Sequence, residues 1–323
     1  VQGERCCALS FSVILTSEGA VDEFEIAPSL ICPTYRLTYD DVDEILELGV
    51  QAEPELRAIA HWATQRKQWR QSQGAISIHM PESSIKVVNE AEITIEVLED
   101  STARQLVAEM MILAGEVAAR YGDAHQLPIP FRNQPQPELP PDEELMLLPA
   151  GWVRDSAIRR CMTRSEVSLT PARHATLGLD EYAQVTSPIR RYSDLLAHFQ
   201  IKAHLRGTPL PFAAEEMSEL IQSLGTSAYE AVGVERQTKR YWALEYLRQA
   251  EGQTWSAMLL RWLREDDGIG LIMLEELGLE LKMRFNRPID LGDRLEVAVS
   301  YVNPRQEVIH FNEVHADVST ATA

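Results

Sequence analysis

The sequence predicts an α+β protein in which helices and strands over residues 1–250 precede a small five-stranded β-barrel of the OB type. Three observations predict this class. Apolar residues recur with helical spacing in several long segments up to residue 249. From Trp255 onward the spacing becomes that of strands. Five short β-prone runs then follow within about 65 residues, separated by turns rich in Gly, Asp and Pro, which is typical of small barrels.

The first elements are expected to be a hairpin and two helices. Residues 8–15 and 21–26 are β-prone strands joined by a turn at 17–19. A short helix then begins with either Thr38 or Asp40 as its N-cap. A second helix covers residues 54–72. Its buried side is predicted to carry Leu56, Ile59, Ala60, Trp62 and Ala63, and its wetter side Arg66, Lys67 and Arg70.

The middle of the chain is expected to alternate between strands, a buried helix and an extended connection. Strands are predicted at 75–79 and 91–98. Residues 102–121 are apolar over a wide arc, so this helix should be central and buried. Six prolines make residues 127–141 an extended, stiff connection. Long helical segments are expected at 182–207 and 213–249.

The C-terminal part is expected to contain the barrel and a tail. The five β-prone runs cover residues 255–263, 270–277, 279–286, 293–302 and 307–314. Residues 251–316 would form this domain, and residues 317–323 a disordered tail.

Composition is that of an ordinary globular protein with room for two domains, at 45% hydrophobic and 24% charged residues. The four cysteines (Cys6, Cys7, Cys32 and Cys161) form no C-x-x-C pair, which argues against a structural zinc site and a disulfide framework. A reducing cytosol is the compartment that this cysteine usage fits best.

No signal peptide is visible at Val1–Arg5, and the apolar runs are too short to span a membrane. The missing initiator methionine suggests that a segment precedes Val1.

The net charge of −19 argues, taken alone, against nucleic-acid binding, which needs a basic surface. The charge is uneven, however. Residues 151–200 contain seven arginines against five acidic residues, a local balance of +2. A local groove for an anion therefore remains compatible with the composition.

Residues 182–194 are the sharpest candidate site. Ser187 is a good N-cap and Pro188 a good first helical residue, so the free N–H groups there would favour an anion. Arg190 and Arg191 in the first turn could reach a phosphate at that position. The alternative is an ordinary ion pair with Asp194, which follows these arginines at helical spacing. The residues alone leave both readings open.

Residues 186–198 read TSPIRRYSDLLAH, and this run resembles the signature of the RNB family of 3′→5′ exoribonucleases, to which ribonucleases II and R belong. The resemblance extends upstream to Arg173 and His174, to LVAEMMILAGEVAA at 106–119 and to AVGVERQTKRYWALEYL at 231–247. It implies that residues 1–250 are most of an RNB catalytic domain and that 251–316 are an OB-fold RNA-binding domain.

The resemblance implies an enzyme that cuts single-stranded RNA from its 3′ end into nucleoside 5′-monophosphates, using Mg²⁺ held by aspartates. Arg190 matches the family arginine that contacts the scissile phosphate. Tyr39 matches a tyrosine of the RNA 3′-end pocket, and Glu235 a glutamate deep in the RNA channel. Arg191 and Tyr192 belong to the signature and take supporting roles in RNA binding. A monomer in the cytoplasm, or in an organelle of bacterial ancestry, is expected.

The sequence departs from the family at several positions. The aspartate cluster D-x5-D-x-D-D is expected upstream of residue 1, since neither Asp40–Asp41 nor Asp266–Asp267 matches it. The chain alone is therefore expected to be inactive. Gly115 replaces a common asparagine, and Gln184 a frequent histidine.

Two other readings stay open: a non-catalytic RNA-binding or scaffold relative, and a protein-interaction surface formed by the acidic segments. Phe285 and Tyr301 are weaker candidates for stacking on RNA bases.

Overall fold

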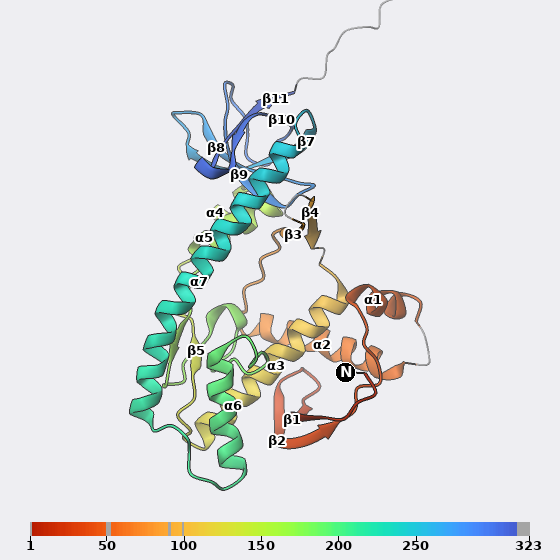
Figure 1. Ribbon diagram of the computed structural model, residues 1–323, viewed down its shortest axis with the longest axis vertical. Coiled ribbons are helices and arrows are strands. Elements are labelled where there is room, and N and C mark those ends of the chain that lie inside the picture. Colours follow the sequence, from red (N-terminus) through yellow and green to blue (C-terminus); the bar gives the residue numbers. More distant parts are fainter. Residues whose placement is uncertain (1, 50–52, 90–91, 99, 315–323) are drawn as a thin grey trace, which may run out of the picture. The chain divides into compact units, whose positions relative to one another are not determined.

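The computed structural model describes residues 2–49, 53–89, 92–98 and 100–314 (Figure 1). The chain divides into two compact units. The first unit contains residues 1–77, 100–137 and 162–227, and the second contains 78–99, 138–161 and the chain from 228 onward. Helices and antiparallel strands occur in both, so the predicted mixture of α and β structure is confirmed. The predicted tail at 317–323 lies outside the described residues, and the domain boundary at residue 250 stays a prediction.

The first unit opens with the predicted hairpin, formed by β1 (Cys6–Leu15) and β2 (Val21–Ile31). Helix α1 (Tyr39–Glu47) follows. Its N-cap is Thr38, whose hydroxyl accepts the Asp41 N–H at 3.1 Å while the Asp41 carboxylate accepts the Thr38 N–H at 2.7 Å. These hydrogen bonds hold the pKa of Asp41 below its ordinary value. Asp41 therefore has a local role as half of a capping box.

Helix α3 (Thr102–Ala124) is the centre of the first unit, as predicted. Val117, Ala118 and Ala119 are fully buried in it. Helix α2 (Pro54–Ser72) packs against α3. The predicted buried side of α2 is correct for Ala63 but wrong for Arg66 and Arg70, which are buried, and for Ile59, which is exposed. Acidic side chains of α3 meet these arginines, which is why they are not on the solvent side.

The predicted strand at 75–79 is absent from the described structure. The N–H of Ala75 donates to Arg70 O at 2.8 Å and that of Ile76 to Thr176 O at 3.1 Å, so this backbone bonds to the end of α2 and to a distant segment instead of to a strand. The strand of this region is instead β3 (Glu82–Val88) in the second unit. It pairs with β4 (Glu92–Leu98), which is the strand predicted at 91–98.

The rest of the first unit consists of short elements around α3. The proline-rich connection is extended, as predicted, and contains β5 (Phe131–Asn133). This strand pairs with β6 (Glu166–Ser168) and bridges to Ala183. The remaining elements are the 3₁₀ turn η1 (Ala175–Leu177), helix α6 (Tyr192–Leu205), which carries the end of the 182–194 segment, and the N-terminal part of α7 (Ala214–Gln249).

Gly115 of α3 lies directly against the segment that leads to α6. The Ala183 N–H donates to Gly115 O at 3.1 Å. A Cβ atom at position 115 would lie 2.1 Å from the Tyr182 ring and 2.7 Å from the carbonyl oxygen of Ala183. No side chain fits there without a shift, so the backbones of α3 and of residues 182–183 are in close contact.

The second unit contains a five-stranded antiparallel sheet in the order β11-β10-β7-β8-β9, drawn in blue in Figure 1. Its strands are β7 (Thr254–Arg264), β8 (Ile269–Leu274), β9 (Leu279–Arg284), β10 (Arg294–Asn303) and β11 (Val308–Glu313), with the 3₁₀ turn η2 (Pro304–Gln306) before the last. All five predicted strand runs are confirmed. Within the described residues, no pairing joins β9 to β11, so the sheet is not a closed barrel.

Helices α4 (Asp142–Leu147), α5 (Trp152–Cys161) and the C-terminal part of α7 (Ala214–Gln249) complete the second unit. Leu244 and Leu247 of α7 are fully buried and share a core with Leu259, Ile272 and Val297 of the sheet. Among the helices of the described ranges, none combines the length and apolarity that crossing a membrane requires.

Candidate functional site

The signature segment forms a tight turn before helix α6. Ser187 O accepts the N–H of Arg190 at 3.2 Å and that of Arg191 at 2.9 Å. The helix begins only at Tyr192, with Arg191 as its N-cap residue. The prediction that Ser187 caps the helix and that both arginines lie in its first turn is therefore wrong. The Ser187 N–H donates to the Asp194 carboxylate at 2.8 Å, and this bond holds the chain in a turn ahead of the helix.

Asp194 is the centre of this turn and is fully buried. Besides Ser187, its Oδ2 atom accepts the Nε and Nη2 groups of Arg191 at 3.1 and 2.7 Å. Arg191 Nη2 also donates to Thr186 Oγ1 at 3.2 Å. The ion-pair alternative is thus correct for Arg191. Because the carboxylate is buried, this pair fixes the shape of the turn and is more than a solvated surface contact.

Arg190 has a different environment from Arg191. It lies in the turn and is exposed, with the neighbouring side chain of Ile189 also fully open to solvent. Within the described ranges, no hydrogen bond or ion pair involves the Arg190 guanidinium. Tyr192, at 43% exposed, opens helix α6 beside it. The segment therefore presents one guanidinium with all its donors available and uses the other to hold the turn.

Arg132 of β5 lies in the electrostatic neighbourhood of this turn and was not anticipated from the sequence. Its Nε donates to Ser165 Oγ and its Nη1 to Gln184 Oε1, both at 3.1 Å. Burial lowers the pKa of Arg132 below its ordinary value, and the nearby Arg191 lowers it further, while Asp194 opposes the shift. In the sequence, Arg132 is one residue of the proline-rich connection at 127–141, and no motif there indicates a binding site.

His174 lies behind the turn and is neutral at pH 7. Burial lowers its pKa from 6.5 to about 4, and the positive charge of Arg132 contributes. The side chain is only 8% exposed, and its Nδ1 atom is enclosed without a hydrogen-bond partner. The ring meets Tyr182 edge to face with 5.7 Å between centroids. Burial raises the pKa of Tyr182, so both rings remain uncharged.

The other two predicted RNA-binding residues lie elsewhere. Tyr39 is the first residue of α1 and is 40% exposed, with the Arg104 guanidinium 4.4 Å from its ring centroid. Glu235 belongs to the second unit, where it is exposed on α7 and 2.8 Å from Lys239 Nζ. That hydrogen bond lowers the pKa of Glu235. The structure thus brings Arg190, Arg191 and Tyr192 together, and no contact between described residues joins Tyr39 to them.

The described residues do not fit a metal ion. Among them, no group of three or more His, Cys, Asp or Glu side chains lies close enough to hold one. Asp41 is engaged in the cap of α1, and Asp267 lies in a turn where it pairs with Arg264 at 3.2 Å. Asp41 and Asp267 thus have the local roles predicted for the two aspartate pairs.

Two ion pairs buried between α2 and α3 support the first unit. Arg66 is fully buried and pairs with Glu116, and Arg70 pairs with Glu109. Arg120 also lies 2.7 Å from Glu116. The signal for this network was present in the sequence: the arginines are four residues apart and the glutamates seven apart, so each pair of like charges shares one helix face.

Several basic side chains lie on the outer face of the sheet in the second unit, where Glu280, two residues before Lys282, is paired with Arg159. In the register of β7, β8 and β9, Arg261 and Lys282 flank Leu271. Directly opposed residues point to the same face, so both cations share it. The next row holds Arg264, Ile269 and Arg284 in the same order. Basic side chains thus border an apolar strip, although the chain as a whole is strongly acidic.

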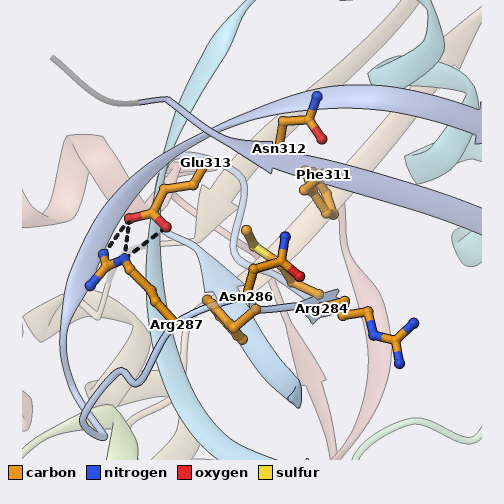
Figure 2. A pocket seen from close by; sticks show the side chains of 8 residues that line it. Arg284, Asn286, Arg287, Phe311, Asn312 and Glu313 are labelled. Carbon is orange, nitrogen blue, oxygen red and sulfur yellow. Dashed lines mark hydrogen bonds and ion pairs between the residues drawn. The ribbon is translucent and has the colours of Figure 1, made fainter. Parts of the chain in front are cut away.

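A hollow of about 520 Å³ lies between the ends of β9 and β11 (Figure 2). Arg287 and Glu313 close one end of it through a bidentate pair, with Nε–O distances of 3.1 and 3.0 Å, and Arg284 extends away from them. Phe285 is only 7% exposed and packs edge to face on Trp262, so it belongs to the core and not to an open stacking surface. Tyr301 is 50% exposed and remains available for stacking.

Comparison with known proteins places this chain among ribonucleases. The RNB domain family matches residues 1–146 and 151–207. The uncharacterized ribonuclease sll1290 of Synechocystis sp. is 60% identical over 317 residues, which cover 98% of this chain and 48% of that protein. The chloroplastic/mitochondrial ribonuclease II of Arabidopsis thaliana is 40% identical over 97% of the chain and 40% of its own length. The chain thus spans about half the length or less of these relatives.

The fold is similar to that of a solved ribonuclease. The apo form of Mycoplasma genitalium RNase R matches with a TM-score of 0.82 and 18% identity, over 97% of this chain and 58% of that one. The same protein in complex with ribose-methylated single-stranded RNA matches with a TM-score of 0.81. At 18% identity, this similarity shows a shared fold and nothing about function.

Proposed function

The chain belongs to the RNB domain family, and from this premise we propose that it is part of a 3′→5′ exoribonuclease that hydrolyses single-stranded RNA to nucleoside 5′-monophosphates. One observation carries the proposal: a turn fixed by the buried Asp194 presents Arg190 at the surface, with a guanidinium that none of the described residues pairs. The ribonuclease names of the relatives support the same reaction.

The proposed role of Arg190 is to bind the scissile phosphate. A guanidinium offers a planar fork of N–H donors that matches phosphate oxygens. Donors already in place where negative charge develops lower the barrier without reorganisation. Arg191 is proposed to act through Asp194 by holding the turn, and Tyr192, Tyr39 and Glu235 to line the path of the RNA. The intact protein is proposed to use Mg²⁺, with ligands other than the described residues.

The second unit is proposed to bind RNA as an OB-type domain. The basic outer face of β7, β8 and β9 suits the phosphate backbone of a single strand, and its apolar strip suits the bases. The proposed partner is therefore single-stranded RNA. We further propose a monomer, located in the cytoplasm or in an organelle of bacterial ancestry.

The test is to incubate the full-length protein and Mg²⁺ with single-stranded RNA carrying a 5′ label. Stepwise shortening from the 3′ end with release of nucleoside 5′-monophosphates is expected, and RNA with a blocked 3′ end should resist. Residues 1–323 alone are expected to release none. RNA binding by the full-length protein without release of nucleotides would instead identify a non-catalytic RNA-binding relative.

A further inference from the structure

Arg132 is joined to the signature segment through both its backbone and its side chain. Its N–H donates to Tyr182 O at 2.8 Å, and the preceding residue bridges to Ala183. Its Nη1 donates to Gln184 Oε1 at 3.1 Å. The guanidinium is therefore fixed relative to the strand-like stretch that leads into the 186–194 turn.

Most of the hydrogen-bonding capacity of Arg132 is unused. A guanidinium has five N–H donors, and within the described residues two hydrogen bonds occupy it, to Ser165 and Gln184. Both acceptors are neutral. The Nη2 group has no hydrogen-bond partner among these residues, and it is not one of the fully enclosed polar atoms that lack a partner, so it is not sealed off from solvent. Arg132 thus has open donors on a partly buried, oriented side chain.

Within the described part of the chain, no carboxylate forms a hydrogen bond or ion pair with this guanidinium. Asp194 is the nearby anion, and its Oδ2 atom is taken by Arg191 and Ser187. Counting Arg132, Arg190 and Arg191 against Asp194 gives three positive charges and one negative charge, a local balance of +2. His174 adds no charge near neutral pH. Like charges gathered around a buried carboxylate favour a bound anion.

We propose that Arg132 binds a phosphate of the RNA held at the 186–194 turn, and that Gln184 is a positioning residue that aims its guanidinium. The inference rests on the proposed function, because it takes RNA as the ligand of that turn. It adds an RNA-binding residue outside the signature, contributed by strand β5. It also gives Gln184 a role, because its Oε1 atom accepts a hydrogen bond from Arg132 and holds that guanidinium in place.

The experiment measures RNA affinity with the full-length protein in EDTA, so that no cleavage occurs. Binding of a labelled single-stranded RNA is followed over a series of KCl concentrations for the wild type and for Arg132→Gln, Arg132→Lys and Gln184→Ala. Arg206→Gln is the matched control, since Arg206 is an exposed arginine of the first unit at the far end of α6. Thermal unfolding of each variant is recorded alongside.

Arg132→Gln is expected to weaken binding about tenfold or more, as for the loss of one charge-assisted hydrogen bond. The slope of log K against log salt should become shallower by about 0.7, the value for one phosphate contact on a single strand. Arg132→Lys should keep the slope and recover part of the affinity. Gln184→Ala should weaken binding with the slope kept. Arg206→Gln should match the wild type.

Three outcomes separate the possibilities. If the wild type binds RNA and Arg132→Gln behaves as Arg206→Gln does, the inference is overturned and the proposed function stands. A weaker affinity with an unchanged slope and a lowered unfolding temperature would assign Arg132 a structural role, which also overturns it. If the wild type neither binds nor cleaves RNA, the proposed function itself fails.

Discussion

At the scale of single residues, two adjacent arginines with the same chemistry have opposite environments. Arg191 is bound to a fully buried carboxylate, whereas Arg190 is left in solvent. The difference arises from the turn at 187–190, which the bond from the Ser187 N–H to Asp194 holds in place. A polar group enclosed without a partner is costly, so Asp194 depends on Arg191 as much as the turn depends on Asp194.

Arg190→Ala is the first prediction at this scale. In the intact protein it should remove about 2–4 kcal/mol of transition-state stabilisation, roughly 30- to 1,000-fold in rate, which is the size of the effect of losing one preorganised donor. RNA affinity should change little, because Arg190 is proposed to act on the scissile phosphate. Single-turnover rates and Kd values check this, and a large loss of affinity at an unchanged rate would contradict the assigned role.

The second prediction concerns His174 and pH. Its pKa in the folded protein is about 4, against about 6.5 when unfolded. The unfolded chain therefore binds more protons between these values, so stability falls as the pH drops from about 6.5 to about 4. The slope is at most about 1.4 kcal/mol per pH unit. His174→Phe keeps a ring against Tyr182 and removes the proton.

Urea unfolding of wild type and His174→Phe at several pH values measures this effect. The dependence on pH that the wild type shows between 4 and 6.5 should be reduced in the variant, with the two curves converging in slope above pH 7. Equal slopes throughout the acidic range would mean that His174 is protonated in the folded state at the same pH as in the unfolded chain.

At the scale of elements, the packing of α2 on α3 is carried by buried charge. Arg66 donates to Gly19 O at 2.7 Å in addition to its pair with Glu116, so one side chain joins α2, α3 and the β1–β2 turn. Burial lowers the pKa of Arg66, and the carboxylate of Glu116 opposes part of that shift. Removing the carboxylate would leave an unpaired buried cation.

Glu116→Ala is accordingly expected to lower the unfolding free energy of the protein by about 3–5 kcal/mol, as for other broken buried pairs. Asp180→Ala is the control. Asp180 also pairs with an arginine, Arg173, but its side chain is 95% exposed, so the loss should stay under about 1 kcal/mol. Chemical denaturation checks both, and similar losses for the two variants would mean that the buried pair contributes no more than a surface pair.

Elements with a strong periodic pattern were predictable and those decided by tertiary contacts were not. The 102–121 helix and the five strands after 254 follow from spacing alone. The start of α6 did not, because it depends on a bond between Ser187 and Asp194 that sequence spacing does not reveal. The burial of Arg66 and Arg70 in α2 was missed because charged residues are ordinarily solvated, and only the partner helix makes their burial favourable. Arg132 was missed because β5, with three residues, is too short to show a periodic hydrophobic pattern.

At the scale of the whole molecule, the distribution of charge matters more than its sum. A chain of −19 would repel RNA at long range. Some of the cations, however, lie together at the signature turn and on the outer face of the sheet in the second unit. Contacts at short range release counterions from the RNA, and this favours binding despite the net charge.

The double variant Arg261→Gln with Lys282→Gln tests the sheet face. In the full-length protein, the slope of log K against log salt for single-stranded RNA should become shallower by about 1.4, for two phosphate contacts. Arg305→Gln, an exposed cation in η2, should leave the slope unchanged. Identical slopes for the wild type and the double variant would exclude this face from the RNA path.

The contact at Gly115 has a consequence for how the protein can evolve. Because a Cβ there would meet the Tyr182 ring at 2.1 Å, the two positions cannot change independently. A larger residue at 115 therefore requires both a smaller residue at 182 and a backbone shift at Ala183, whose carbonyl oxygen lies 2.7 Å from the same Cβ position, so the order in which mutations arise decides which sequences are reachable. Position 115 in α3 and position 182 ahead of the signature turn are therefore expected to evolve together.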